Sequence, residues 1–182
     1  NIKQGVGNMA KQWITLVLIG IMLTAPAAKA QILAGDTRFG IINQLQWGMT
    51  VNEVREVCAR QALVLAATDS TLSYKMTLFG FEARAKIQVE RTSQKVRAIH
   101  IAFVESTGGI RDSLINHFTT IVGKQPLLTT KEKNVVIFTI KTEAASWVNG
   151  KEGIHVFSMM RGNEVLGTTL LLSPLVKEKK PN

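Results

Sequence analysis

The sequence predicts an α+β fold, a two-layer sandwich in which an antiparallel sheet carries two helices on one face. Three observations indicate this class. Apolar and polar residues alternate with a period of two along residues 72–78 and 81–89, as in strands that bury one side. Apolar residues recur at helical spacing in residues 51–61 and 110–122. The order of helix, three strands, helix, then three or four strands places a helix layer on an antiparallel sheet.

The first helix is expected to begin at Val51. Thr50 is a residue type that caps helices, and Glu53 three positions later completes a capping box. Val51, Val54 and Cys58 share one face of the helix, so we interpret Cys58 as a small buried residue. It is the one cysteine of the chain and cannot form an internal disulfide.

Three strands are expected after this helix. Residues 72–78 and 81–89 form a hairpin around Gly80, and both stretches alternate. The third strand, residues 96–104, is apolar on both sides. It is therefore predicted to be a central strand, either covered on both faces or meeting a partner with its second face.

The second half is expected to repeat this order. A helix over residues 110–122 is followed by a short strand at 127–130 and a β-branched strand at 135–141, which residues 146–148 extend after a kink. We predict one continuous sheet with pseudo-twofold symmetry. Two small tandem α-β units are the alternative.

A hairpin ends the predicted sheet. Residues 154–160 and 165–172 are apolar runs, and the Gly162-Asn163 pair between them is a typical hairpin turn. Residues 31–176 are expected to form a single α+β domain, with residues 177–182 as a basic tail.

Residues 1–30 are interpreted as an N-terminal extension and signal peptide. A lysine at position 11 precedes the uncharged apolar run 13–23, and Ala28-Lys29-Ala30 has the small-x-small pattern of a signal-peptidase site. The run has 11 residues, whereas a membrane-spanning helix needs about 20. We therefore expect cleavage before Gln31 and a periplasmic or secreted bacterial protein, with a retained membrane anchor as the alternative.

The charge of the chain favours acidic partners. The net charge is +9, and residues 1–30 contain three lysines and no acidic residue, which leaves +6 for the remainder. Such an excess suits an acidic protein surface, an acidic glycan or anionic lipid. Nucleic acid is not expected, since export removes that partner. A lipid anchor is not expected either, because Cys58 lies far beyond the apolar run, and no transmembrane helix is expected after cleavage.

No catalytic, cofactor or metal site is predicted. The sequence has no nucleophile elbow, dinucleotide-binding glycine motif or P-loop. His100, His117 and His155 do not pair at the spacings of metal ligands. Glu82 and Glu90 lie among basic neighbours, which indicates a charged solvent face rather than an acid–base pair.

One candidate interaction patch is assigned. Trp147, His155, Phe157 and Met159 are large residues on predicted strands. If all four share an exposed sheet face, they form an apolar patch of the kind that marks a partner site.

A short motif carries a resemblance to known families. Gly48-Met49-Thr50-x-x-Glu53-Val54, followed by a strand hairpin, resembles the helix opening of small exported α/β domains. The outer-membrane assembly lipoproteins of the SmpA/OmlA type have such an opening, and so do the tandem repeats of the β-lactamase-inhibitor-protein type. This chain lacks the anchor cysteine of the first group and the paired cysteines of the second. Both resemblances imply a binding module that acts through a sheet face or loops.

The sequence thus favours an exported, non-enzymatic binding or assembly module of the bacterial cell envelope, which uses a sheet face or edge against a protein partner. The alternative is a periplasmic carrier that holds a small molecule or lipid between helices and sheet. An enzyme assembled from scattered residues is a third class.

Overall fold

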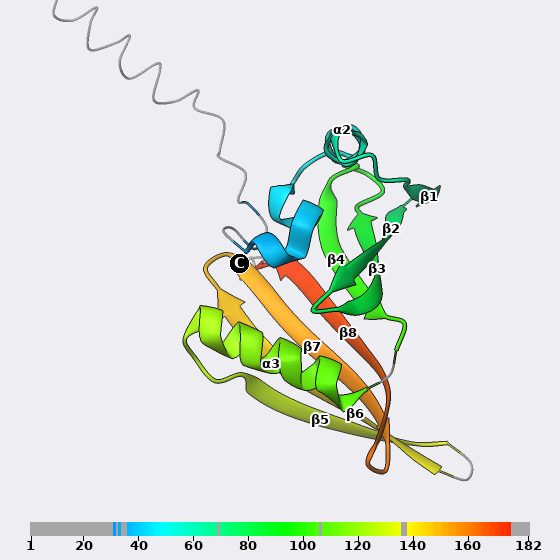
Figure 1. The fold of residues 1–182 in the computed structure, drawn as a ribbon, viewed down its shortest axis with the longest axis vertical. Coiled ribbons are helices and arrows are strands. Elements are labelled where there is room, and N and C mark those ends of the chain that lie inside the picture. The colour runs from blue at the N-terminus through cyan, green and yellow to red at the C-terminus, as the bar shows by residue number, and fades with distance from the viewer. Residues whose placement is uncertain are drawn as a thin grey trace, which may run out of the picture.

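The computed structural model describes Gln31, Leu33 and residues 36–68, 70–105, 107–135 and 138–175. This part of the chain forms one antiparallel sheet and three helices, which confirms the α+β class (Figure 1). The predicted signal peptide and the basic tail 177–182 lie outside the described residues.

The sheet has eight strands in the order β1-β2-β3-β4-β8-β7-β6-β5. The elements along the chain are the 3₁₀ helix η1 (Thr37–Gln44), α2 (Val51–Arg60), β1 (Ala66–Thr68), β2 (Thr71–Leu78), β3 (Phe81–Val89), β4 (Val96–Phe103), α3 (Gly108–Val122), β5 (Leu127–Val135), β6 (Phe138–Asn149), β7 (Glu152–Arg161) and β8 (Glu164–Pro174). Because β4 pairs with β8, the first and second groups of strands form one continuous sheet, as predicted.

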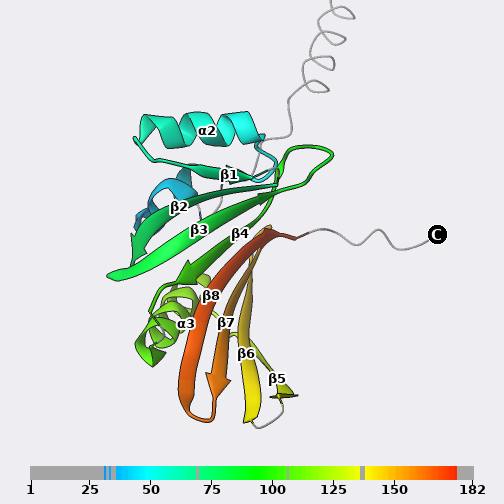
Figure 2. The ribbon, with the colours of Figure 1, turned by 90° about the vertical axis from the view of Figure 1, so that its right-hand side faces the viewer.

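The inner face of the sheet carries the core. Residues paired across neighbouring strands point to the same side, and one such row is Ile87, Ile99, Leu172, Ile154 and Trp147. All five are buried, and they share one hydrophobic cluster with side chains of η1, α2 and α3. Helix α3 runs beside β6, β7 and β8 in Figure 2 and contacts all three.

Helix α2 starts as the sequence predicts. The Thr50 side chain accepts a hydrogen bond from the Glu53 amide, and the Glu53 carboxylate accepts one from the Thr50 amide at 2.7 Å. This capping box satisfies donors that the first turn leaves without helical partners. Cys58 is buried on the inner side of the helix, and burial raises the pKa of its thiol.

The prediction for strands β5 and β6 was wrong in its boundaries. Residues 135–141 are not one strand, because Val135 ends β5 and pairs with Phe138 at the start of β6. β5 continues beyond Thr130 although residues 131–134 are polar and exposed. An edge strand is held by hydrogen bonds to its neighbour, so polarity alone does not mark its end.

The β2–β3 hairpin has an unusual turn residue. Phe79 has φ +53° and Gly80 has φ +84°, the left-handed pair of a tight hairpin turn. A bulky residue rarely adopts this conformation. The ring of Phe79 lies edge-on to Phe39 at 6.2 Å and 5.1 Å from the ring of His117, and the Arg38 guanidinium lies 5.8 Å from its centroid. Contacts with η1 and α3 therefore hold the hairpin tip.

Candidate functional site

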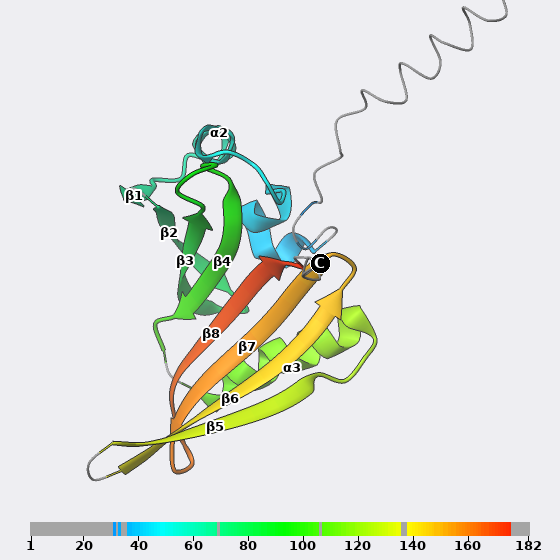
Figure 3. The same ribbon diagram turned by 180° about the vertical axis from the view of Figure 1, so that it is seen from behind.

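The face of the sheet opposite the core is called the outer face. In Figure 3 the strands β6, β7 and β8 lie in front of α3, and no helix of the described residues crosses β4, β8, β7 or β6 on this side. One row across this face is Lys86, His100, Leu171, His155 and Ser146, from β3, β4, β8, β7 and β6. Except for the exposed Lys86, these residues are partly buried.

Three of the four predicted patch residues lie together on the outer face. His155, Phe157 and Met159 alternate along β7, and Met159 is 43% exposed. Trp147 does not lie with them, since it pairs with Ile154 on the inner face and is 4% exposed. Its indole N–H donates to the Lys124 carbonyl at 3.1 Å.

The Trp147 placement could not be read from alternation alone. Alternation fixes which residues of one strand share a face. Which residues of two neighbouring strands share a face depends on the pairing register, and the turn between the strands sets that register. Here Asn149 pairs with Glu152, which puts odd-numbered residues of β6 opposite even-numbered residues of β7. The grouping of Trp147 with His155 is therefore corrected.

His155 is held in one orientation on the outer face. Its Nδ1 lies 2.9 Å from the Ser146 hydroxyl, and its ring stacks on Phe157 with centroids 6.0 Å apart. Burial lowers the pKa of the imidazole. Gly153 lies beside the ring, since a Cβ there would be 3.0 Å from His155 Nε2 and 3.2 Å from Ser173 Oγ.

Gly153→Ala is expected to displace the His155 ring and to lower the free energy of unfolding by about 1 kcal/mol, because the added methyl overlaps two side chains. The measurements are urea unfolding and the ring resonances of His155. Gly167→Ala is the matched control, since a Cβ there meets nothing within 4 Å, and a change within about 0.5 kcal/mol is expected. Unmoved His155 resonances in Gly153→Ala would contradict this packing.

His100 and His155 are not neighbours in the row. Leu171 of β8 lies between them, so their backbone positions are two strand spacings, about 10 Å, apart. Burial lowers the pKa of His100, and Lys86 adds to that effect. Within the described residues, no group of three or more histidine, cysteine, aspartate or glutamate side chains is arranged to hold a metal ion.

The outer face has an apolar centre beside a basic border. The centre of the outer face consists of partly buried or exposed residues of β4, β8, β7 and β6, and we call it the outer patch. Its residues are His100, Ala102, Thr169, Leu171, His155, Phe157, Met159 and Ala144. The "basic border" is Lys75, Arg84 and Lys86 on β2 and β3, all three exposed. Glu82 is the one acidic residue at the outer positions of β2, β3 and β4.

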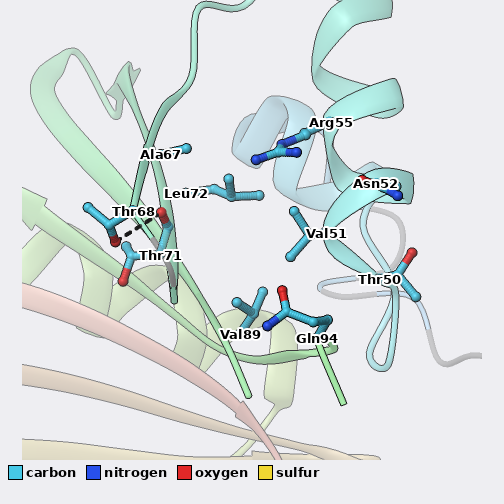
Figure 4. Close-up of a pocket in the computed structure, with 10 residues that line it drawn as sticks. All are labelled: Thr50, Val51, Asn52, Arg55, Ala67, Thr68, Thr71, Leu72, Val89 and Gln94. Carbon is cyan, nitrogen blue, oxygen red and sulfur yellow. Dashed lines mark hydrogen bonds between the residues drawn. The ribbon is translucent and has the colours of Figure 1, made fainter. Parts of the chain in front are cut away.

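A separate pocket lies between α2 and the β1–β2 edge. It has a volume of about 620 Å³, and Figure 4 shows its lining side chains. Val51, Leu72 and Val89 supply apolar surface, whereas Arg55 and Gln94 are polar. A smaller pocket of about 110 Å³ lies between α3 and strands β5 to β7, next to the ion pair of Arg111 and Glu143.

Sequence reasoning missed Glu152, the buried carboxylate at the start of β7. It is 5% exposed and accepts hydrogen bonds from the Leu33 amide at 3.0 and 3.2 Å and from the Trp47 indole N–H at 3.0 Å. Burial raises its pKa, although both hydrogen bonds oppose this. A glutamate beside Lys151 in a turn gives no sequence signal of burial. Its contacts make it an anchor for the segment before α2.

The second buried polar pair joins η1 to α3. His117 Nε2 lies 2.5 Å from Asp36 Oδ2, and the rings of Phe39, Phe79 and Phe118 surround the imidazole. Burial outweighs the attraction of Asp36 and lowers the pKa of His117. Neither residue lines the pockets described above, so the pair belongs to the packing of α3.

The structure therefore defines a class, an α+β protein with an open eight-stranded antiparallel sheet. The chain matches no known protein-family model, and neither curated proteins nor solved structures match it. In the described part of the chain, no helix has the length and apolar character needed to cross a membrane.

Proposed function

We propose that this chain is an exported, non-enzymatic binding or assembly module of the bacterial cell envelope, and that it binds a protein partner through the outer face. The predicted signal peptide supports export. The resemblance to small exported binding domains supports the class. The finer architecture is part of the same proposal: two helix-plus-strand halves related by a pseudo-repeat, with both helices on the face opposite the binding surface.

The observation that carries the proposal is the outer patch itself. It spans four adjacent strands of one sheet, so its backbone is rigid before a partner arrives. Its centre holds Leu171, Phe157 and Met159 rather than charged side chains. Continuous apolar surface with a polar rim is typical of protein interaction sites.

The β5 edge of the sheet is a weaker candidate than the face. β5 is an edge strand, and Leu127 and Leu128 at its start are exposed. Its second half carries Lys131, Glu132 and Lys133, also exposed. Charged residues, lysine above all, discourage another strand from pairing with an edge.

Phe157→Glu is expected to abolish capture of the partner, because it places a charge at the centre of the apolar patch. Tagged protein expressed in its own host would be chemically cross-linked in intact cells and the products compared by mass spectrometry. Ile121→Glu is the control, since Ile121 is 40% exposed and lies on α3, on the opposite face of the sheet from the patch. Equal recovery of the same stoichiometric partner by Phe157→Glu and wild type would refute the proposal.

A second candidate is a carrier of a small molecule or lipid. The pocket of about 620 Å³ between α2 and β1–β2 favours it, because apolar Val51 and Leu72 share it with Arg55. Native mass spectrometry of protein from its own host would reveal a bound ligand. Val51→Trp should fill the pocket and remove that ligand, and Val64→Trp should not. Absence of any bound ligand in the wild-type spectrum would eliminate this candidate.

A further inference from the structure

The charge pattern of the outer face indicates the chemistry of its partner. Lys75 pairs with Arg84 across β2 and β3, and Lys86 lies two residues further along β3, on the same face. None of the three has an ion pair among the described residues. The outer face therefore has two distinct halves. One half carries three adjacent cations without an acidic partner, and the other is the apolar outer patch.

We propose that the outer face binds an acidic amphipathic segment of a partner protein, with its apolar side on the outer patch and its carboxylates over the basic border. This inference rests on the proposed function and adds the chemistry of the partner to it. Opposite charges across an interface favour association and select the partner.

The dimensions of the face suit a short helix. From β3, which carries Arg84 and Lys86, to β7, which carries Phe157, there are three strand spacings. At about 4.8 Å each they span about 14 Å. A helix of about ten residues rises about 15 Å, so one segment laid across the strands reaches both halves of the surface.

A second copy of this chain fits the face poorly. The outer positions of β2, β3 and β4 offer Glu82 as their one acidic residue against the three cations of the basic border. The whole chain has net charge +9. Two outer faces in contact would therefore repel each other.

A membrane surface also fits poorly. Proteins that dock on bilayers insert apolar side chains among the lipids. In the outer patch, Phe157 and Leu171 are partly buried in the sheet surface, and Met159 is the one large apolar side chain that is exposed. A shallow surface of this kind is suited to covering by another folded segment.

The test uses three synthetic peptides of about twelve residues and two kinds of vesicle. The first peptide is an amphipathic helix of glutamate and leucine, the second has lysine in place of glutamate, and the third contains the first peptide's residues in scrambled order. The vesicles contain phosphatidylcholine alone or with phosphatidylglycerol. Binding to the full chain is measured by fluorescence anisotropy at low and high salt, and by the backbone resonances of β7 and β8.

The acidic amphipathic peptide is expected to bind, and its affinity should fall with salt because the border charges are exposed. Arg84→Glu combined with Lys86→Glu should weaken binding roughly tenfold or more. Arg60→Glu combined with Arg91→Glu changes the net charge equally at exposed sites away from the outer positions of the sheet and should leave binding unchanged. Circular dichroism and thermal unfolding would establish that both double variants fold.

Equal binding of the lysine peptide or the scrambled peptide would overturn the inference, and so would binding to phosphatidylglycerol vesicles without binding to any peptide. Failure of the acidic amphipathic peptide to bind would also overturn the inference. A different result would separate this inference from the proposed function. If Phe157→Glu loses the cellular partner while the Arg84 and Lys86 reversals keep it, the outer face binds a partner of different chemistry.

Discussion

Phe118→Ala is expected to lower the free energy of unfolding by about 3–5 kcal/mol, because it leaves a large cavity where three elements meet. Phe118 is fully buried on α3. Its ring centroid lies 5.8 Å from those of Phe39 in η1 and Trp147 in β6. Urea unfolding followed by circular dichroism measures the loss.

The matched control for Phe118 is on the same helix. Ile121 is 40% exposed, so Ile121→Ala removes apolar atoms that are already partly in contact with water. A change of less than about 1 kcal/mol is expected there. If the two substitutions had similar effects, α3 would not pack on the sheet as described.

Glu152→Ala is expected to destabilise the fold by about 2–3 kcal/mol at neutral pH, because it leaves the Leu33 amide and the Trp47 indole N–H buried without an acceptor. Glu152→Gln keeps one acceptor oxygen and should cost less. Glu164→Ala, at the exposed β7–β8 turn, should change stability by less than about 0.5 kcal/mol. Thermal unfolding compares all three. An Ala variant as stable as wild type would exclude the anchoring role of Glu152.

Glu152 also gives stability a pH dependence of known sign. Burial raises the pKa of the folded carboxyl above its ordinary value of 4.5, so the folded chain binds this proton more readily than the unfolded chain. The contribution to stability is therefore fully present below pH 4.5 and is lost as pH rises through the raised folded value. Glu152→Gln has no such proton, and the stability of wild type relative to it should decrease over that range.

Local patterns predicted most elements of the sheet. Strand β3 matches its alternating stretch, and α2 starts at the capping box of Thr50 and Glu53. The run at 96–104 is apolar on both sides because β4 lies in the middle of the sheet, where its second side joins the outer patch. These features depend on neighbours within a few residues of the chain, which a sequence displays directly.

Pairings between residues far apart in the chain could not be predicted from the sequence. The β6–β7 register decided that Trp147 faces the core while His155 does not. Glu152 looks like a surface residue until its contact with Trp47, which lies 105 residues earlier in the chain, is known. Likewise, the basic border and Phe157 belong to one sheet face only because β4 pairs with β8. Alternation predicts which residues of each strand share a face, but the candidate site forms only when long-range strand pairing brings those residues together.

The pairing of β4 with β8 also has a consequence for the order in which the molecule assembles. β8 follows every other strand along the chain, yet it occupies the centre of the sheet. A polypeptide that emerges with its N-terminus first has an unsatisfied β4 edge, including Ile99 and Ile101, until residues 169–172 arrive. Contacts between such distant segments form slowly. A chain of this topology therefore keeps an incomplete sheet until its last strand is available, and reaches its final form only after β8 has paired with β4.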